Sequence, residues 1–228
     1  MIILHIETST NVCSVALSEN SDCIFSKSNA DGMNHAALLS VFIAEALEVL
    51  KLQGKSLNAV AVSSGPGSYT GLRIGVSTAK GLCYGLDIPL IGVSTLEVLA
   101  VQAIMSIANS ENALFCPMID ARRMEVYSAF YDSKLNLKRE ISAVIIDSES
   151  YSEILANQAV YFFGNGADKC KTTLTHSNAH FIQNIVPLAT NMIHLAEKAY
   201  SEQKFVDTAY FEPFYLKEFQ TSVPTKPN

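Results

Sequence analysis

The sequence has few charged residues and no concentrated run of basic ones. Aspartate, glutamate, lysine and arginine make up 17% of the 228 residues, and the formal net charge is −6. Binding to nucleic-acid phosphates needs clustered lysine and arginine, so this acidic chain is a poor nucleic-acid binder by itself. Hydrophobic residues make up 49% of the chain. So much apolar surface to bury suggests a partner protein.

The cysteines are few, scattered and not arranged in any paired spacing. They are Cys13, Cys23, Cys83, Cys116 and Cys170. Because no Cys-x-x-Cys occurs, neither a disulfide framework nor a cysteine zinc site is predicted. We expect reduced, buried thiols in a cytosolic protein.

Long uninterrupted hydrophobic runs are also lacking. The N-terminus has no basic segment followed by a long apolar core, so no signal peptide is expected. The most apolar predicted helix, over residues 36–52, is interrupted by Glu45 and Glu48. We therefore expect no membrane span.

Hydrophobic patterning predicts alternating strands and helices along the whole chain. Strands are predicted over residues 2–7, 12–18, 22–28, 57–62, 89–93, 114–119, 124–132, 137–145, 160–163 and 180–186. Helices are predicted over 34–52, 72–84, 94–108 and 190–203, with one more beginning at Ser150. Asn34 is the expected cap of the first helix, and Ser94 with Glu97 and Ser150 with Glu153 are expected capping boxes.

Six of the eleven glycines fall between Gly65 and Gly85, where a predicted buried strand turns into a predicted helix. Ser68 or Thr70 could cap that helix. Gly67, Gly71 and Gly75 are four residues apart and share one helix face.

Two interpretations of this glycine turn stay open. The free N–H groups at the helix N-terminus, beside Arg73, could hold an anion. Alternatively, the glycines allow tight packing of the helix. The spacing matches neither a P-loop, because no Lys-Ser/Thr closes it, nor the dinucleotide fingerprint, which it misses by one residue. Spacing alone favours packing.

The two halves of the chain repeat one pattern. Residues 1–110 predict three strands followed by alternating helices and strands, and residues 111–219 read much the same. In each half the first strand ends in a carboxylate, Glu7 or Asp120, before a polar turn. We predict a duplicated α/β fold whose acidic turns face a cleft between two lobes, followed by a tail over residues 220–228.

Several segments carry a resemblance to one known family. They are Ile-Glu-Thr-Ser at 6–9 with Cys-Ser-Val-Ala at 13–16, Gly-Pro-Gly-Ser-Tyr-Thr-Gly-Leu-Arg-Ile-Gly at 65–75, Ile-Gly-Val-Ser-Thr-Leu at 91–96, Ile-Asp-Ala-Arg at 119–122 with Glu-Val-Tyr at 125–127, and Pro-Phe-Tyr-Leu-Lys at 213–217. In these segments the chain resembles the TsaB (YeaZ) family, over nearly its whole length and most strongly over residues 1–130. The resemblance implies an actin/Hsp70/sugar-kinase-like (ASKHA, ribonuclease H-like) fold with two βββαβαβα-type lobes.

The resemblance also implies a function. Family members are non-catalytic partners of the TsaD-type enzyme. With the small ATPase TsaE, they support threonylcarbamoyl transfer to the adenosine beside the anticodon of tRNA. They pair through their first two helices, with the enzyme or as a homodimer when alone, and tRNA is bound mainly through the partners. The resemblance thus implies a cytoplasmic accessory subunit without a complete active site. The alternatives are an independent small-molecule phosphotransferase or ATPase of the same fold and, less favoured, a peptidase, for which sequence supplies no triad geometry.

Two sets of residues are candidate sites. A weak nucleotide or phosphate cleft, able to bind ATP or ADP without requiring a cofactor, comprises Glu7, Thr8, Ser9, Gly65, Gly67, Ser68, Asp120, Gly164 and Gly166. A partner interface on the first two helices comprises His35, Leu38, Val41, Phe42, Glu45, Arg73, Val76, Ala79 and Lys80. Ordinary core packing is the alternative for the apolar members of the second set.

No metal site is predicted. The family often has aspartate where this chain has Glu7, and the longer side chain argues against a kinase-like metal site. His35 stands alone, where the catalytic paralogue has two histidines four residues apart on a helix. His176 and His180 have that spacing, but they lie in a polar, turn-like segment without an acidic neighbour.

Overall fold

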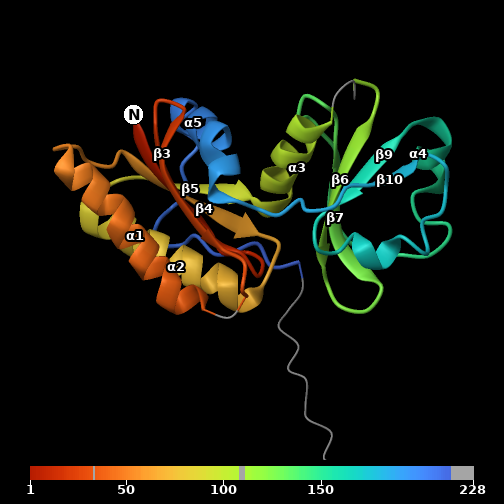
Figure 1. The fold of residues 1–228 in the computed structure, drawn as a ribbon, viewed down its shortest axis with the longest axis horizontal. Coiled ribbons are helices and arrows are strands. Elements are labelled where there is room, and N and C mark those ends of the chain that lie inside the picture. The colour runs from red at the N-terminus through yellow and green to blue at the C-terminus, as the bar shows by residue number, and fades with distance from the viewer. Residues whose placement is uncertain (33, 108–110, 217–228) are drawn as a thin grey trace, which may run out of the picture.

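A computed structural model describes residues 1–32, 34–107 and 111–216, which form two lobes lying side by side (Figure 1). Each lobe is built on a five-stranded sheet, with strand order β3-β2-β1-β4-β5 in the first and β10-β9-β6-β7-β8 in the second. The strands are β1 (Ile2–Glu7), β2 (Cys13–Glu19), β3 (Asp22–Asn29), β4 (Ala59–Gly65), β5 (Leu90–Ser94), β6 (Leu114–Asp120), β7 (Glu125–Tyr131), β8 (Leu137–Ile145), β9 (Val160–Phe163) and β10 (Ala179–Phe181). The helices are α1 (His35–Leu52), α2 (Tyr69–Leu86), α3 (Thr95–Ser106), α4 (Ser152–Asn157) and α5 (Ile193–Ser201), with 3-10 turns η1 (Asp168–Cys170) and η2 (Ala189–Met192).

The two sheets have the same topology. In the first, β1 and β2 and then β2 and β3 pair antiparallel, whereas β1 with β4 and β4 with β5 pair parallel. In the second, β6, β7 and β8 pair antiparallel in sequence, whereas β6 with β9 and β9 with β10 pair parallel. The predicted duplicated α/β fold is therefore confirmed.

Helices cover both faces of the first sheet (Figure 1). Leu39 and Phe42 of α1 and Val76 of α2 pack in one core with Leu4 and Ile6 of β1. On the opposite face, α5 covers β1 and β5. The C-terminal helix α5 therefore completes the first lobe, because a strand that is buried on both faces needs apolar side chains packed against each face.

The second lobe has shorter cover and shares α3 with the first. Leu99 of α3 packs against Phe115 and Phe163 of the second sheet, while α3 also contacts β4 and β5. On the far face of the second sheet lie α4 and η1, six and three residues long, where α1 and α2 have 18 residues each.

Several predicted element boundaries are wrong. α2 begins at Tyr69 rather than at residue 72, because Ser68 caps it and accepts a hydrogen bond from Gly71 N over 3.2 Å. The predicted strand over 180–186 is paired only over Ala179–Phe181, and Asn184, with a φ of 62°, leaves the extended conformation. The predicted helix over 190–203 begins as the 3-10 turn η2.

The other predicted caps make no side-chain cap bond. Asn34 and Ser94 occupy the N-cap positions of α1 and α3 without bonding a helix N–H through their side chains. Tyr151, rather than Ser150, is the N-cap of α4. The Ser150 hydroxyl instead donates to Asp147 Oδ1 and accepts from Asp147 N, so a local turn uses its hydrogen bonds.

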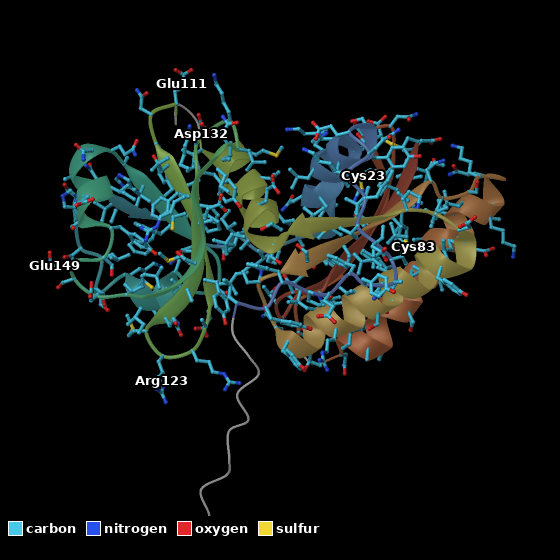
Figure 2. All side chains as sticks on the ribbon, turned by 180° about the vertical axis from the view of Figure 1, so that it is seen from behind. Cys23, Cys83, Glu111, Arg123, Asp132 and Glu149 are labelled. Carbon is cyan, nitrogen blue, oxygen red and sulfur yellow. The ribbon has the colours of Figure 1, made fainter. Side chains whose placement is uncertain are left out.

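Four of the five cysteines are buried, as predicted, but Cys23 is exposed on the edge strand β3 (Figure 2). Burial raises the pKa of the Cys13 and Cys83 thiols to about 11, which keeps them protonated. All five are free thiols. Among the helices of the described residues, none is long and apolar enough to cross a membrane. The predicted tail, 220–228, lies outside the described residues.

Candidate functional site: an interlobe cleft and a two-helix face

The glycine face of α2 receives the chain's own β1–β2 turn. A Cβ atom on Gly71 would lie 2.1 Å from Thr8 O, and one on Gly67 would lie 2.3 Å from Ser9 O. Ser68 N donates to Ser9 O over 2.6 Å, and the Thr8 hydroxyl donates to Gly71 O over 2.8 Å. Of the two interpretations of the glycine turn, tight packing is the one that these contacts support.

Glu7, at the end of β1, is fully buried beside this turn. Its Oε1 accepts from Ser9 N over 2.6 Å and from the Ser63 hydroxyl over 3.2 Å, while Oε2 has no hydrogen-bond partner among the described residues. Burial raises the pKa of Glu7 to about 7, because removing the carboxylate from water disfavours its charge more than these donors stabilise it. The prediction that Glu7 faces the cleft is wrong.

A cavity of about 1300 Å³ does lie between the lobes. Its walls are the β1–β2 turn, the first turns of α1 and α2, the β6–β7 turn, Asn165 and residues 214–216 near the C-terminus. The predicted interlobe cleft therefore exists, and of its predicted residues Ser9, Gly67, Ser68 and Asp120 line it.

The remaining predicted cleft residues serve packing. Thr8 is buried, and Gly65 lies beneath the C-terminal segment, where a Cβ atom would lie 2.8 Å from Phe214 O. A Cβ on Gly164 would lie 2.5 Å from Met118 O, and one on Gly166 2.8 Å from the carbonyl carbon of Ile119. These glycines bring backbone segments together rather than opening them to a ligand.

The β6–β7 turn forms the other wall of the cleft. Lys169 donates to Asp120 Oδ1 and to the carbonyl oxygen of Glu125. Asp120 Oδ1 also accepts from Arg122 N over 3.0 Å, and Asn165 Oδ1 accepts from Asp120 N over 3.0 Å. Asp120 therefore already has a cation and a backbone partner.

Two cleft-lining arginines were missed by the sequence analysis. Arg122 and Arg123 are exposed, line the cavity, and adopt φ values of 70° and 48°. Figure 2 shows Arg123 at the tip of the turn. Two consecutive arginines directly after a strand-ending aspartate are the signal that could have indicated them.

The segment 206–216, here called the strap, lies against α2 and the ends of β4 and β5, and it forms one side of the cleft. Lys80 Nζ donates to Ala209 O over 2.9 Å and to Phe211 O over 3.0 Å, and Phe214 N donates to Ser64 O over 2.7 Å. Phe214, Tyr215 and Leu216 line the cavity. Their place in the cavity could not be predicted from the sequence, because the position of the strap depends on contacts between residues far apart along the chain.

The predicted partner-interface residues divide between core and surface. Phe42, Val76 and Ala79 are buried in the core, so they offer no area to a partner. Val41 is 50% exposed, and Leu38 is half-buried. The apolar excess of α1 is therefore explained mainly by packing, with Val41 on its outer face.

The charged members of that set have partners within the chain. Glu45 pairs with Lys27, and Lys80 holds the strap. The Arg73 guanidinium stacks on the Tyr69 ring at 4.2 Å, and its Nε lies 3.4 Å from the Tyr215 hydroxyl.

The histidines do not come together. His35 Nε2 lies 3.2 Å from Val12 O and the side chain reaches the cleft, whereas the His180 ring packs on Tyr161 and His176 Nδ1 accepts from Asn178 N. Within the part of the chain that the structure describes, no three His, Cys, Asp or Glu residues group as metal ligands.

The fold and this cleft define a duplicated α/β protein of the ASKHA class. The family model described as "TsaD: tRNA N6-adenosine threonylcarbamoyltransferase" matches residues 30–222. A TsaB protein of Escherichia coli is 30% identical over 95% of both chains, and one of Haemophilus influenzae is 29% identical over 95% of this chain and 94% of its own. Both are named tRNA threonylcarbamoyladenosine biosynthesis proteins.

Solved structures agree with this assignment. "YeaZ from Pseudomonas aeruginosa" superposes with a TM-score of 0.78 at 25% identity, covering 94% of this chain and 99% of its own. A second structure, of "an uncharacterized protein with similarity to peptidase YEAZ" from the same organism, gives 0.80 at 25% identity over 95% and 99%. The chain belongs to the TsaB (YeaZ) family, within the wider TsaD-type family, and the resemblance seen in the sequence is confirmed.

Proposed function

We propose that this chain acts in tRNA threonylcarbamoyladenosine biosynthesis as a non-catalytic subunit that binds and activates a TsaD-type enzyme together with a TsaE-type ATPase. The observation that carries this proposal is the match to TsaB proteins over 95% of the chain. The net charge of −6 supports recruitment of tRNA mainly through partners. A cytoplasmic location and a homodimer in the absence of the enzyme are part of the same proposal.

The outer face of α1 and α2 supports the choice of interface. Val41 and Leu52 of α1 are 50% and 80% exposed, and Tyr84 and Leu86 of α2 are 88% and 51% exposed. The two helices lie side by side on one face of the first lobe (Figure 1). Exposed large apolar side chains on two adjoining helices provide apolar area that a partner protein could cover.

The surroundings of the two strand-ending carboxylates support a non-catalytic role. Glu7 is sealed from the cleft, and Asp120 is paired with Lys169. A general base must reach its substrate proton, which the buried Glu7 carboxylate cannot do, whereas the exposed Asp120 carboxylate already has Lys169 as its counter-ion. No arrangement of side chains in the described part of the chain favours the peptidase alternative.

The independent phosphotransferase or ATPase remains the second candidate, because the cleft is large enough for a nucleotide. Turnover of ATP by the purified chain alone would favour it. Turnover only in the presence of the TsaE-type partner would favour the subunit role.

The proposed subunit role is tested by mass measurement. The purified chain is mixed with its cognate TsaD-type protein, and light scattering after size exclusion should show a one-to-one complex. Val41→Asp should abolish that complex while changing the free energy of unfolding by less than about 0.5 kcal/mol, because the side chain is exposed. No complex with the unmodified chain would contradict the proposal.

Met105→Asp is the matched control. Met105 is 78% exposed on α3, away from the α1–α2 face, so the same charge at this position should leave the complex intact. If both variants lose the complex equally, the interface is not on α1 and α2.

A further inference from the structure

The strap is seated on two glycines at the ends of β4 and β5. A Cβ atom on Gly92 would lie 3.0 Å from the ring of Phe211. A Cβ atom on Gly65 would lie 2.8 Å from Phe214 O. Phe214 N also donates to Ser64 O over 2.7 Å. Because a larger side chain at either glycine would meet the strap, the first sheet is shaped to receive the strap in this position.

Two side chains of α2 hold the strap on its other side. Lys80 Nζ donates to Ala209 O over 2.9 Å and to Phe211 O over 3.0 Å. Arg73 Nε lies 3.4 Å from the Tyr215 hydroxyl. Positions 73 and 80 are seven residues apart, so both side chains leave the same flank of the helix. The strap is thus held between the glycine seat and one flank of α2.

The space beside the strap is not filled by side chains. A second cavity of about 640 Å³ lies against it, with residues 211–215 on one wall and Ser94 of β5 and Ile141 of β8 on others. Tyr210 and Phe214 of the strap are 84% and 46% exposed. Local stability is low where a segment borders unfilled space and leaves aromatic side chains in water.

The end of the strap lies between two cavities. Phe214 and Tyr215 line the second cavity and also the interlobe cleft. Residues 207–216 contain neither helix nor strand, so moving them breaks no ladder of backbone hydrogen bonds. If these residues moved, the two cavities would join, and the cleft would lose the aromatic side chains of one wall.

We propose that residues 211–216 are a movable wall of the interlobe cleft, held closed by Lys80 and Arg73. The structure shows the closed state. In the open state these residues leave the glycine seat, while both sheets and α2 stay folded. The population of the open state then depends on side chains of α2 that lie outside the cleft, so contacts made on this flank of α2 can change the cleft. This proposal concerns the isolated chain and does not rest on the proposed function.

Amide hydrogen exchange of the full, isolated chain tests whether the wall moves. The Phe214 N–H should exchange roughly a hundredfold faster than the N–H groups of β4, because opening the strap does not require unfolding of the sheet. Low concentrations of urea should hardly change its rate, since little surface is exposed. Equal rates at Phe214 and in β4 would overturn the proposal. So would exchange of Phe214 as fast as that of an unprotected amide, because the strap would then not close.

Lys80→Met tests the contact with α2. It removes both hydrogen bonds to the strap, so exchange of the Phe214 N–H should rise roughly tenfold while exchange in β4 stays unchanged. Lys51→Met is the matched control, because it removes the same charge from a side chain of α1 that is 79% exposed. The same acceleration in both variants would show a general effect of charge and overturn the role of Lys80.

Gly92→Val tests the seat without changing α2. Valine is favoured in strands, so β5 should be retained, while the new side chain would meet the Phe211 ring. Exchange at Phe214 should again rise roughly tenfold, with no change in β4. Unchanged exchange at Phe214 in both Gly92→Val and Lys80→Met would overturn the proposal.

A thiol reagent tests whether opening exposes the second cavity. The hydroxyl oxygen of Ser94 is buried. In Ser94→Cys, combined with Cys23→Ser to remove the exposed native thiol, the introduced thiol should react faster in the variants that accelerate exchange at Phe214. If it reacts only as slowly as the buried Cys116 and Cys170 in every variant, no open state reaches the cavity and the proposal is wrong.

Discussion

The first strand of each lobe ends in a carboxylate, and the two carboxylates lie in opposite surroundings. Glu7 of β1 is fully buried, whereas the side chain of Asp120 at the end of β6 is 46% exposed and paired with Lys169. The lobes share one strand order, so topology alone does not account for the difference.

Part of the difference between Glu7 and Asp120 comes from which face of its strand each residue occupies. Glu7 lies on the same face of β1 as Ile3, which packs under α5 and η2. Asp120 lies on the same face of β6 as Met118, which packs with α4 and η1, the elements that correspond to α1 and α2. Successive side chains on a strand point to opposite faces, so an offset of one residue exchanges a sealed face for an open one.

The length of the covering element accounts for the rest. α2 has 18 residues, and its glycine face lies against the β1–β2 turn. Its counterpart η1 has three residues, and Lys169 extends from it to the carboxylate. The same topology has thus produced a closed turn in one lobe and an accessible turn in the other.

The largest expected effect on stability comes from disrupting the contact between α2 and the β1–β2 turn. In Gly71→Ala the new Cβ would meet Thr8 O at 2.1 Å, so either α2 or the turn must move. The free energy of unfolding, measured in urea, should fall by about 3 kcal/mol.

Gly81→Ala is the control for that substitution. Gly81 lies on the same helix with nothing within 4 Å of a Cβ atom. Alanine there should raise stability by about 0.5–1 kcal/mol, because it lowers the entropy of the unfolded chain. Equal destabilisation by both substitutions would show that helix propensity, rather than close packing, sets the requirement for glycine.

The second prediction concerns the buried carboxylate of the first lobe. Burial raises the pKa of Glu7 from 4.5 to about 7, so its contribution to stability is complete below pH 4.5 and is lost as the pH rises through 7. Glu7→Gln mimics the protonated form and should remove that loss, roughly 3 kcal/mol by pH 8. Free energies of unfolding for both proteins between pH 4.5 and 8 measure the difference. Parallel curves would mean that the pKa of Glu7 is the same in the folded and unfolded protein.

The third prediction concerns His5, on the same face of β1. Burial lowers its pKa from 6.5 to about 3, so its contribution is complete above pH 6.5 and is lost as the pH falls toward 3. Between pH 6.5 and 5 that loss should reach about 2 kcal/mol. His5→Gln, which can keep a hydrogen bond to Ser18, should flatten the acid side of the stability curve. If the free energy of unfolding of His5→Gln falls with acid as steeply as that of the unmodified protein, a group other than His5 causes the acid sensitivity.

The smallest effect is expected in the second lobe. Asp120→Asn removes an ion pair whose side chains are 46% and 23% exposed, so stability should change by less than about 1 kcal/mol. If the free energy of unfolding in urea fell by more than about 2 kcal/mol, both acidic turns would be structural supports of similar importance. The proposed difference between the two lobes would then be wrong.

Local sequence patterns predicted the order of strands and helices, but they did not predict correctly which individual residues are buried. The alternation of elements and the strand-to-helix position of the glycines were correct, because hydrophobic periodicity and turn chemistry act over neighbouring residues. The pattern did not predict which side chains point into the core. Phe42 and Val41 are adjacent and both apolar, yet Phe42 is buried in the core and Val41 is exposed on the surface.

The sequence by itself determined two strand-and-helix repeats, a glycine turn that requires close approach, and membership of the TsaB family. Only the tertiary structure decided that Glu7 is sealed while Asp120 is open, that α5 crosses to the first sheet, and that the strap brings Tyr215 into the same cavity as Arg122 and Arg123. The physical reason is distance along the chain. A local pattern does not specify which face of a strand is covered, because that depends on how whole helices and strands pack. It also does not specify contacts between residues a hundred positions apart.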